Sequence, residues 1–341
     1  MRTTIVGSLG ACLAFTLVTL LPGAQSLRAQ VPAPTTPWGH PDIQGVWTSE
    51  PELGVPFERS PELGTREELT DEEFAERAAR AEAQLESDHA DFDLETADIS
   101  RAGAVGSPTS PPPHWLERGT PSRRTSMVIS PANGRLPERV ARGGGRGGGQ
   151  AGGRGGAGRG VSTNANARRS FESWLDMGLY DRCITRGMPN AMFPAIYNAN
   201  TQIVQGPDHV AITYEMVHET RVIPLVERAP LPEDHDQFTG DSRGHWDGKT
   251  LVVESGNYSD RSSFRGASAS ARLVERFTRV DDETLRYEVT VIDPESWTEP
   301  WTAALNMKTQ PDGMFEYACH EGNRAMRNML SGARADDAGT D

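Results

Sequence analysis

The strongest constraint on the fold is a dense succession of short alternating segments in the second half of the chain. Between residues 201 and 320, apolar and polar side chains alternate with the period of a half-buried β-strand. Turn-forming sequences such as Asp247-Gly248 and Pro311-Asp312-Gly313 separate these segments. Strands so closely spaced pair as antiparallel hairpins. The predicted fold is therefore mainly β, an antiparallel barrel or a sandwich. The predicted strands are 201–206, 209–218, 220–226, 250–255, 272–280, 284–292, 301–308 and 314–320.

The chain is predicted to form one β-rich domain over residues 38–334, and the other segments are additions to the strands of this domain. A first strand enters at Pro41 to Thr48, and a helical excursion over 70–88 begins with a capping box from Thr70 to Glu73. Further predicted elements are a Pro-rich lead-in at 27–37, a strand at 124–129, a flexible Gly-rich loop at 143–160, a short helix at 170–177, a C-terminal helix ending at Gly332 and a polar tail at 335–341.

The N-terminus has the layout of a secretory signal peptide. Arg2 supplies a positive charge, residues 5–21 are apolar and uncharged, and Ala24 and Ser26 are small residues suited to cleavage. A permanent membrane anchor is the alternative, since the apolar stretch nearly reaches spanning length. The prediction is a signal peptide over residues 1–26 and a periplasmic or secreted protein without a permanent membrane anchor.

Charge argues against a nucleic-acid partner. The chain carries 48 acidic and 34 basic residues, a formal net charge of −14, and no concentrated basic face. Arginines punctuate the glycines of segment 143–160, which resembles an RGG-type RNA-binding segment. The acidity of the chain and its predicted export favour a flexible insertion instead.

The cysteine count predicts one disulfide. Removal of the signal peptide takes away Cys12 and leaves Cys183 and Cys319 in a chain bound for an oxidising compartment. Two unpaired buried thiols are the alternative. Pairing is favoured because an even number of cysteines in such a compartment is typical of disulfides.

Two polar side chains lie on faces that are otherwise apolar. In the predicted strand 272–280, Glu275 shares a face with Leu273 and Phe277, and His218 ends the apolar row of strand 209–218. A buried carboxylate or imidazole must have a polar partner or line a wet cavity. One interpretation is therefore structural, with Glu275 paired to an arginine across the sheet. The other is a ligand cavity inside the barrel. The predicted ligand-binding residues are Tyr214, Met216, Arg221, Phe277 and Trp301.

Polar residues also gather in two loops. The run from Gly240 to Gly248 contains Asp241 and Arg243, and His320 and Glu321 follow Cys319. An acid–base enzyme would use Glu275 or Asp241 as the base and His218 or His320 as the acid, with Arg243 or Arg221 holding a carboxylate or an oxyanion. The structural interpretation is that Asp241 and Arg243 clamp the loop to the barrel. No motif has metal-ligand spacing, so no metal and no cofactor is predicted.

Several long blocks resemble a large family of uncharacterised exported bacterial proteins. The blocks are PWGHPDIQGVWT, CITRGMPNAMFPAIYNANTQIVQ, GDSRGHWDGKTLVVE, LVERFTRVDDETLRYEVTVIDPESWTEPWTA and EYACHEGN. They cover residues 38–50 and 120–334, and the resemblance implies export without implying an activity. A looser resemblance to lipocalin-like barrels rests on Gly45-x-Trp47 and on the succession of hairpins.

These observations predict an exported β-barrel that binds a small, partly apolar molecule in its interior. The alternative is a hydrolase, lyase or isomerase that uses a carboxylate–imidazole pair in the same cavity. A surface interaction module is a third possibility, and it requires an exposed apolar patch. The partner is predicted to be a small-molecule ligand or substrate, and the oligomeric state stays open.

Overall fold

The computed structural model describes residues 34–90, 116–140, 173–232, 234–262 and 264–338. The predicted signal peptide and the Gly-rich loop at 143–160 lie outside the described residues. Within the described part of the chain, no helix is both long enough and apolar enough to cross a membrane.

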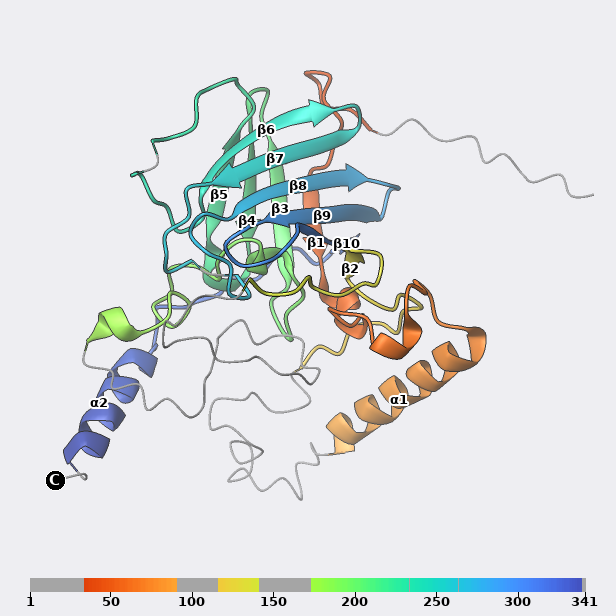
Figure 1. The fold of residues 1–341 in the computed structure, drawn as a ribbon, viewed down its shortest axis with the longest axis horizontal. Coiled ribbons are helices and arrows are strands. Elements are labelled where there is room, and N and C mark those ends of the chain that lie inside the picture. Colours follow the sequence, from red (N-terminus) through yellow and green to blue (C-terminus); the bar gives the residue numbers. More distant parts are fainter. Residues whose placement is uncertain (1–33, 91–115, 141–172, 233, 263, 339–341) are drawn as a thin grey trace, which may run out of the picture. The chain divides into compact units, whose positions relative to one another are not determined.

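Ten strands form one antiparallel sheet that curls into a nearly closed barrel (Figure 1). The neighbours along the sheet follow the order β5-β4-β3-β1-β10-β9-β8-β7-β6, and β2 pairs with β10 beside this path. The strands are β1 Gly45–Thr48, β2 Val128–Ser130, β3 Asn200–Gln205, β4 His209–Tyr214, β5 Thr220–Pro224, β6 Asp241–Asp247, β7 Thr250–Gly256, β8 Arg272–Arg279, β9 Thr284–Ile292 and β10 Trp301–Thr309.

The two strands at the ends of this order, β5 and β6, approach each other at a glycine. A Cβ atom on Gly244 of β6 would lie 3.0 Å from the side chains of both Ile223 and Leu225. A larger residue would push these elements apart, so the glycine permits the barrel to close this tightly.

Side chains at alternate positions along the strands fill the barrel interior. Inward-facing side chains of neighbouring strands lie opposite each other, as Phe277 of β8 and Tyr287 of β9 do, and both of these are fully buried. The largest fully buried side chains among the described residues are Ile43, Trp47, Met188, Met192, Ile203, Ile212, Tyr214, Ile223, Phe277, Tyr287, Trp297 and Trp301.

The predicted strands agree with the structure where alternation is strong. Three predicted strands differ from the structure, and one observed strand was not predicted. Of the strand predicted at 124–129, only the end forms a strand, as part of β2 at Val128–Ser130. Residues 241–247 were expected to be a loop, but they form β6 because their backbone pairs along its whole length with β7. The strand predicted at 209–218 ends at Tyr214, because Val217 adopts a φ of 70° that breaks the alternation. Residues 314–320 form no strand, and the backbone N–H of Phe315 donates to the Glu215 carboxylate instead.

Two α-helices accompany the barrel, α1 at Asp71–Ala90 and α2 at Ala325–Ala338. The predicted helix over 70–88 is confirmed together with its capping box, in which Glu73 and Thr70 exchange hydrogen bonds of 2.8 and 3.3 Å. The C-terminal helix continues past Gly332, and the short predicted helix near 170–177 is a single 3-10 turn. The 3-10 turns are Glu50–Gly54, Pro61–Leu63, Trp174–Asp176, Asn190–Met192 and Met216–His218.

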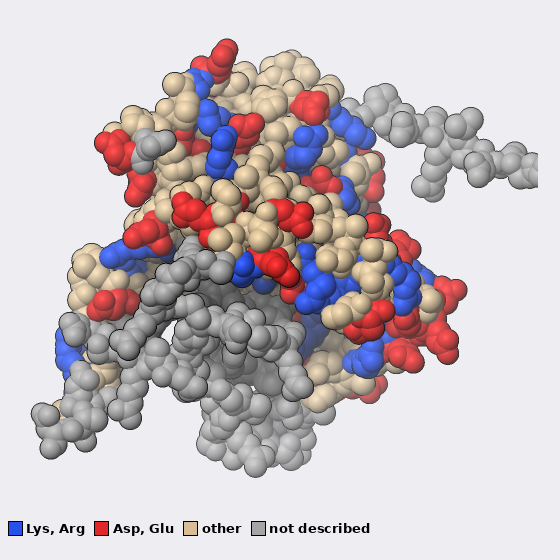
Figure 2. Space-filling view, in the orientation of Figure 1, with Lys and Arg blue, Asp and Glu red and all other residues tan. Residues whose placement is uncertain are grey.

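Charges of both signs are interspersed on the face of the molecule shown in Figure 2. Acidic and basic side chains are mixed there over the strands and over the region of α1, and neither sign forms a broad patch. This distribution on that face is typical of a solvated protein surface rather than of a nucleic-acid interface.

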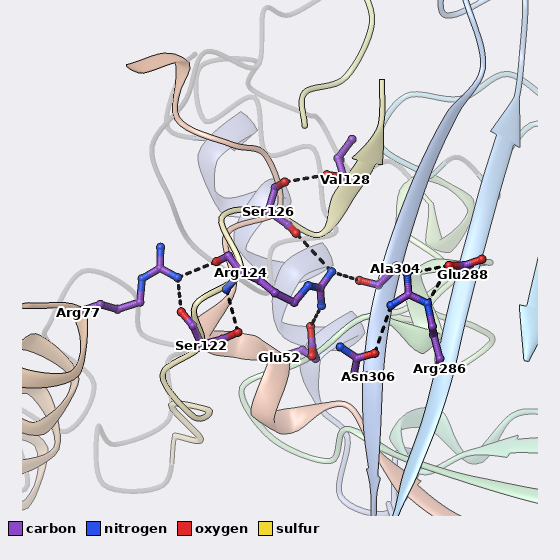
Figure 3. Close-up of polar contacts among 10 residues, drawn as sticks. All are labelled: Glu52, Arg77, Ser122, Arg124, Ser126, Val128, Arg286, Glu288, Ala304 and Asn306. Carbon is purple, nitrogen blue, oxygen red and sulfur yellow. Dashed lines mark hydrogen bonds and ion pairs between the residues drawn. The ribbon is translucent and has the colours of Figure 1, made fainter. Parts of the chain in front are cut away.

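Arg124 connects the segments around residues 52 and 124 to β10 on the outer face of the barrel (Figure 3). Its guanidinium donates to the buried Glu52 carboxylate at 2.5 Å and to the carbonyl oxygen of Ala304 in β10 at 2.7 Å. Arg77 of α1 donates to the carbonyl oxygens of Ser122 and Arg124. These bonds connect α1, the segment around residue 124 and the sheet. Burial raises the pKa of Glu52, although the charge of Arg124 opposes the shift.

Two carboxyl groups, those of Glu50 and Glu117, lie close together beyond the C-terminal end of β1. Burial and the nearby carboxyl of Glu117, which is within hydrogen-bonding reach, raise the pKa of Glu50 from 4.5 to about 7. Folding therefore takes up a proton between these two pH values, because the unfolded chain holds that proton less tightly. The stability that this group contributes is present below about pH 4.5 and is lost as the pH rises through 7.

We predict that Glu50→Gln removes this pH dependence, because glutamine mimics the protonated acid. Partial exposure of Glu50 screens the effect, so the variant should gain about 1 kcal/mol over the wild type between pH 5 and pH 8. Urea denaturation at a series of pH values measures it. The exposed residue Glu72 of α1 provides the control, as Glu72→Gln. Parallel wild-type and Glu50→Gln curves would contradict the prediction.

Candidate functional site

A buried ion pair crosses the barrel interior between β5 and β8. The Arg221 guanidinium donates to both oxygens of Glu275, at 2.6 and 3.0 Å, and the two side chains are 2% and 0% exposed. The hydroxyl of Tyr287 donates to the same carboxylate at 3.0 Å. Of the two interpretations that the sequence left open for Glu275, pairing with an arginine is therefore the one observed.

Three polar atoms around this ion pair are buried without a hydrogen-bond partner of ordinary geometry among the described residues. They are the hydroxyls of Tyr214 and Tyr258 and the Nε of Arg221. Burial is the main cause that raises the pKa of both tyrosines above the usual range, so both hydroxyls keep their protons. An unpaired buried donor costs about 1–3 kcal/mol. Such donors are uncommon in a core, so each calls for a structural or functional explanation. We call these residues, with Glu275 and Tyr287, the interior polar cluster.

A hollow of about 520 Å³ opens at the end of the barrel beside β5. We call it the barrel-end hollow, and it is lined by Ile184, Glu219, Asp236, Gln237, Phe238, Thr239 and Ser259. Its walls combine apolar side chains with carboxylates, an amide and hydroxyls. The lining is more polar than that of most small-molecule sites, and its polar groups offer a ligand several hydrogen-bond partners.

Glu219 connects the barrel-end hollow with the interior polar cluster. It lies two residues before Arg221, and its charge acts on both Arg221 and Tyr214. The hydroxyl of Thr185 donates to the Glu219 carboxylate at 2.5 Å and accepts the N–H of Gly187. Burial raises the pKa of Glu219, and the Thr185 bond and the Arg221 charge only partly oppose it.

The predicted ligand-binding residues fall into three groups. Tyr214 and Arg221 belong to the interior polar cluster, and Phe277 packs beside it with its ring 5.0 Å from that of Tyr287. Trp301 belongs to an aromatic group with Phe57, Phe264 and Trp297. Met216 packs in a separate apolar cluster with Ala195 and Val217. None of the five is among the residues that line the barrel-end hollow.

The predicted histidines meet beside the disulfide. His218 and His320 have ring centroids 6.4 Å apart, and Nδ1 of His218 lies 3.0 Å from the carbonyl oxygen of Tyr317. The predicted disulfide between Cys183 and Cys319 is confirmed, with Cα atoms 5.9 Å apart. The placement of His218 on an apolar strand face was wrong, because the chain leaves β4 before this residue and exposes it.

Asp241 and Arg243 lie on β6, away from both groups. Asp241 is buried and accepts hydrogen bonds from Arg228 and from the N–H of Leu231. Burial alone would raise the pKa of Asp241, but these bonds and the charge of Arg243 outweigh it and lower the pKa. The five predicted catalytic residues therefore occupy three places: the barrel interior, the disulfide and β6.

The sequence interpretation missed Glu219, Tyr258 and Tyr287. A signal existed for Glu219, because it lies two residues from Arg221 and so shares its face of the chain. Tyr258 follows β7 after a turn, and periodicity carries no information about the direction of such a side chain. Among the described residues, no group of three or more His, Cys, Asp or Glu side chains is placed to hold a metal ion.

Comparisons with known proteins add no assignment, since no protein-family model, no curated protein and no solved structure matches the chain.

Proposed function

We propose that the protein binds a small, partly apolar molecule in the barrel-end hollow, with the polar end of the ligand at Glu219. The observation that carries this proposal is the partly buried Glu219 carboxyl of raised pKa on the wall of a hollow of about 520 Å³. That volume lies within the range of small-molecule sites, about 300–1,000 Å³. Phe238 and Ile184 supply apolar contact.

The interior polar cluster supports the same proposal. Its unpaired tyrosine hydroxyls and the Arg221 Nε lie in the region on which the Glu219 charge acts. A ligand group that reaches past Glu219 gains hydrogen bonds that the folded chain leaves unmade. The sequence predicted a binding site in the barrel interior, and the proposal extends this site to the hollow at the end of the barrel.

Export is part of the proposal. The N-terminal segment has the layout of a signal peptide, and the Cys183–Cys319 disulfide is typical of proteins in oxidising compartments. We therefore propose a periplasmic or secreted binding protein.

Nile red, a neutral dye that fluoresces in apolar sites, tests the binding site. We predict that Phe238→Asp weakens dye binding at least tenfold, because it places a charge on the apolar wall of the hollow. The matched control is Phe315→Asp, another exposed phenylalanine that does not line this hollow. It should leave the dye affinity unchanged. Equal dye affinity of wild type and Phe238→Asp, or no dye binding by the wild type, would contradict the proposal.

Acid–base catalysis in the same hollow is the second candidate. The raised pKa of Glu219 favours it, because carboxyls of that kind are common at catalytic positions. Glu275 is a weaker candidate base, since its charge is neutralised by Arg221. If the protein is an enzyme, Glu219→Gln should abolish turnover in a screen of ester and lactone substrates while leaving Nile red affinity within about twofold. A binding protein shows no turnover in either form.

A further inference from the structure

Two of the unpaired donors of the interior polar cluster lie next to Glu219, which lines the barrel-end hollow. The backbone N–H of Tyr214 donates to the carbonyl oxygen of Glu219 at 2.9 Å, so these two residues are opposite each other where β4 and β5 meet. Arg221 follows Glu219 by two residues and is paired with Ile212 of β4. Opposite residues on paired strands, and alternate residues along a strand, share one face of a sheet. The side chains of Tyr214 and Arg221 therefore lie on the same face of the sheet as Glu219, in the barrel interior.

The third unpaired donor, the Tyr258 hydroxyl, lies close to another wall of the same hollow. Tyr258 precedes the lining residue Ser259, whose N–H donates to the carbonyl oxygen of Gln237, also a lining residue, at 2.9 Å. A Cβ atom on Gly240 would lie 2.7 Å from Cζ of Tyr258, the carbon that carries the hydroxyl. Gly240 directly follows the lining residue Thr239. The hydroxyl end of Tyr258 therefore lies beside the segment that borders the hollow, and a glycine permits this close approach.

The three groups have one chemical property in common, since each is a hydrogen-bond donor that lacks an acceptor. Both terminal nitrogens of Arg221 are bonded to Glu275, at 2.6 and 3.0 Å, so its Nε–H is the donor that is left. The hydroxyls of Tyr214 and Tyr258 have no partner of ordinary geometry among the described residues. Burial keeps all three donors away from bulk water. A ligand atom that accepts hydrogen bonds matches this set.

Charge decides which kind of acceptor matches the three donors. The positive charge of Arg221 is already compensated by Glu275, so it is not available to an anion. Glu219 and Asp236 line the hollow, and the lining contains no lysine or arginine. A carboxylate or a phosphate group would therefore be repelled in the hollow and left uncompensated in the interior. A carbonyl oxygen has two lone pairs and no charge, and it requires no acceptor of its own.

We propose that the ligand of the barrel-end hollow carries a neutral carbonyl group, as in a ketone, an ester or a lactone, on an apolar body. The carbonyl oxygen accepts hydrogen bonds from Tyr214, Tyr258 and the Nε of Arg221. The apolar body contacts Ile184 and Phe238. This inference rests on the proposed function, because it names the chemical class of the molecule bound in the same hollow. It adds a requirement that an apolar hollow alone does not impose, namely selectivity for the carbonyl group.

Three probes of similar shape test this selectivity. 2-Acetylnaphthalene carries the carbonyl group, 2-ethylnaphthalene has a methylene group in its place, and 2-naphthoate carries a carboxylate. We predict that Tyr214→Phe and Tyr258→Phe each weaken 2-acetylnaphthalene binding about tenfold and leave the 2-ethylnaphthalene affinity within about twofold, because each variant removes one hydroxyl and keeps the ring. The wild type should bind 2-naphthoate at least about tenfold more weakly than the ketone. Equilibrium dialysis with the full chain measures these affinities.

The matched control is Tyr197→Phe. The Tyr197 hydroxyl lies 3.3 Å from that of Tyr180, and neither residue lines the barrel-end hollow. This variant should bind both neutral probes like the wild type. Infrared spectroscopy adds a measurement that needs no variant, because hydrogen bonds lower the stretching frequency of a carbonyl group. Bound 2-acetylnaphthalene should absorb at or below its frequency in water.

Thermal unfolding separates ligand recognition from a structural role of the donors. Because their hydroxyls are unpaired, Tyr214→Phe and Tyr258→Phe should melt no lower than the wild type. The inference is overturned if both variants bind the ketone like the wild type, if they lose affinity for both neutral probes equally, or if the bound ketone absorbs as it does in heptane. Variants that melt lower and keep their ketone affinity would show that the donors hold an ordered water only, which also overturns it. If neither Nile red nor any of the three probes binds the wild type, the proposed function itself is wrong.

Discussion

Glu275→Leu should destabilise the protein by about 3–5 kcal/mol, the largest effect that we expect from a single substitution. The change leaves the Arg221 guanidinium, which is 2% exposed, as an uncompensated charge inside the barrel. It also removes the acceptor of the Tyr287 hydroxyl. In a domain of this size, each kcal/mol lowers the melting temperature by about 2–4 °C. Urea denaturation and thermal unfolding, both followed by circular dichroism, measure the loss.

A double-mutant cycle separates the ion pair from simple packing. Combining Glu275→Leu with Arg221→Met removes both charges at once, so the double variant should recover most of the lost stability. The half-exposed ion pair of Arg286 and Glu288 on β9 provides the control, in which Glu288→Leu should cost less than about 1 kcal/mol. If Glu275→Leu lowers the free energy of unfolding no more than the control variant does, the prediction is wrong. The Arg221 charge would then not depend on Glu275 for its compensation.

Replacing both Cys183 and Cys319 by serine should cost about 4–5 kcal/mol. The bond closes a loop between residues 136 apart, and on the chain-entropy model the penalty for leaving such a loop open in the unfolded state is of this size. Urea denaturation without reductant compares the variant with the wild type. The wild type treated with dithiothreitol should match the variant.

A free-thiol count provides the independent check on the disulfide. The unreduced protein without its predicted signal peptide should contain no reactive thiol. Two reactive thiols would show that the bond does not form in the isolated protein.

A short stretch of chain connects the disulfide with the barrel-end hollow. Cys183 forms the disulfide, Ile184 lines the barrel-end hollow, and Thr185 donates a hydrogen bond to Glu219. The disulfide therefore anchors the stretch that shapes this candidate site.

The strand-rich half of the fold was predictable because its physical cause is local. Strands β7 to β10 match the predicted ranges closely, since their alternation follows from one buried and one solvated face along each strand. The helix α1 was predictable for the same reason, as its capping box and helix-forming residues are neighbours in the chain. Disulfide formation followed from the count of cysteines alone.

The elements that were missed depend on partners distant in sequence. β6 is rich in polar residues and glycine, and it is a strand because β7 supplies hydrogen bonds along its length. The end of β4 is set by the positive φ of Val217, which periodicity does not reveal. Residues 314–320 alternate like a strand, yet they lie off the sheet and bond to Glu215.

The amino-acid sequence by itself determined the fold class, the disulfide and the requirement that Glu275 find a polar partner. Only the tertiary structure decided that this partner is Arg221, 54 residues earlier in the chain. It also separated the predicted catalytic residues into three places and brought Glu219 to the wall of a hollow. The physical reason is that local geometry decides which face of a strand a side chain lies on. Contacts across a barrel depend instead on the order and register of strands that are distant in sequence.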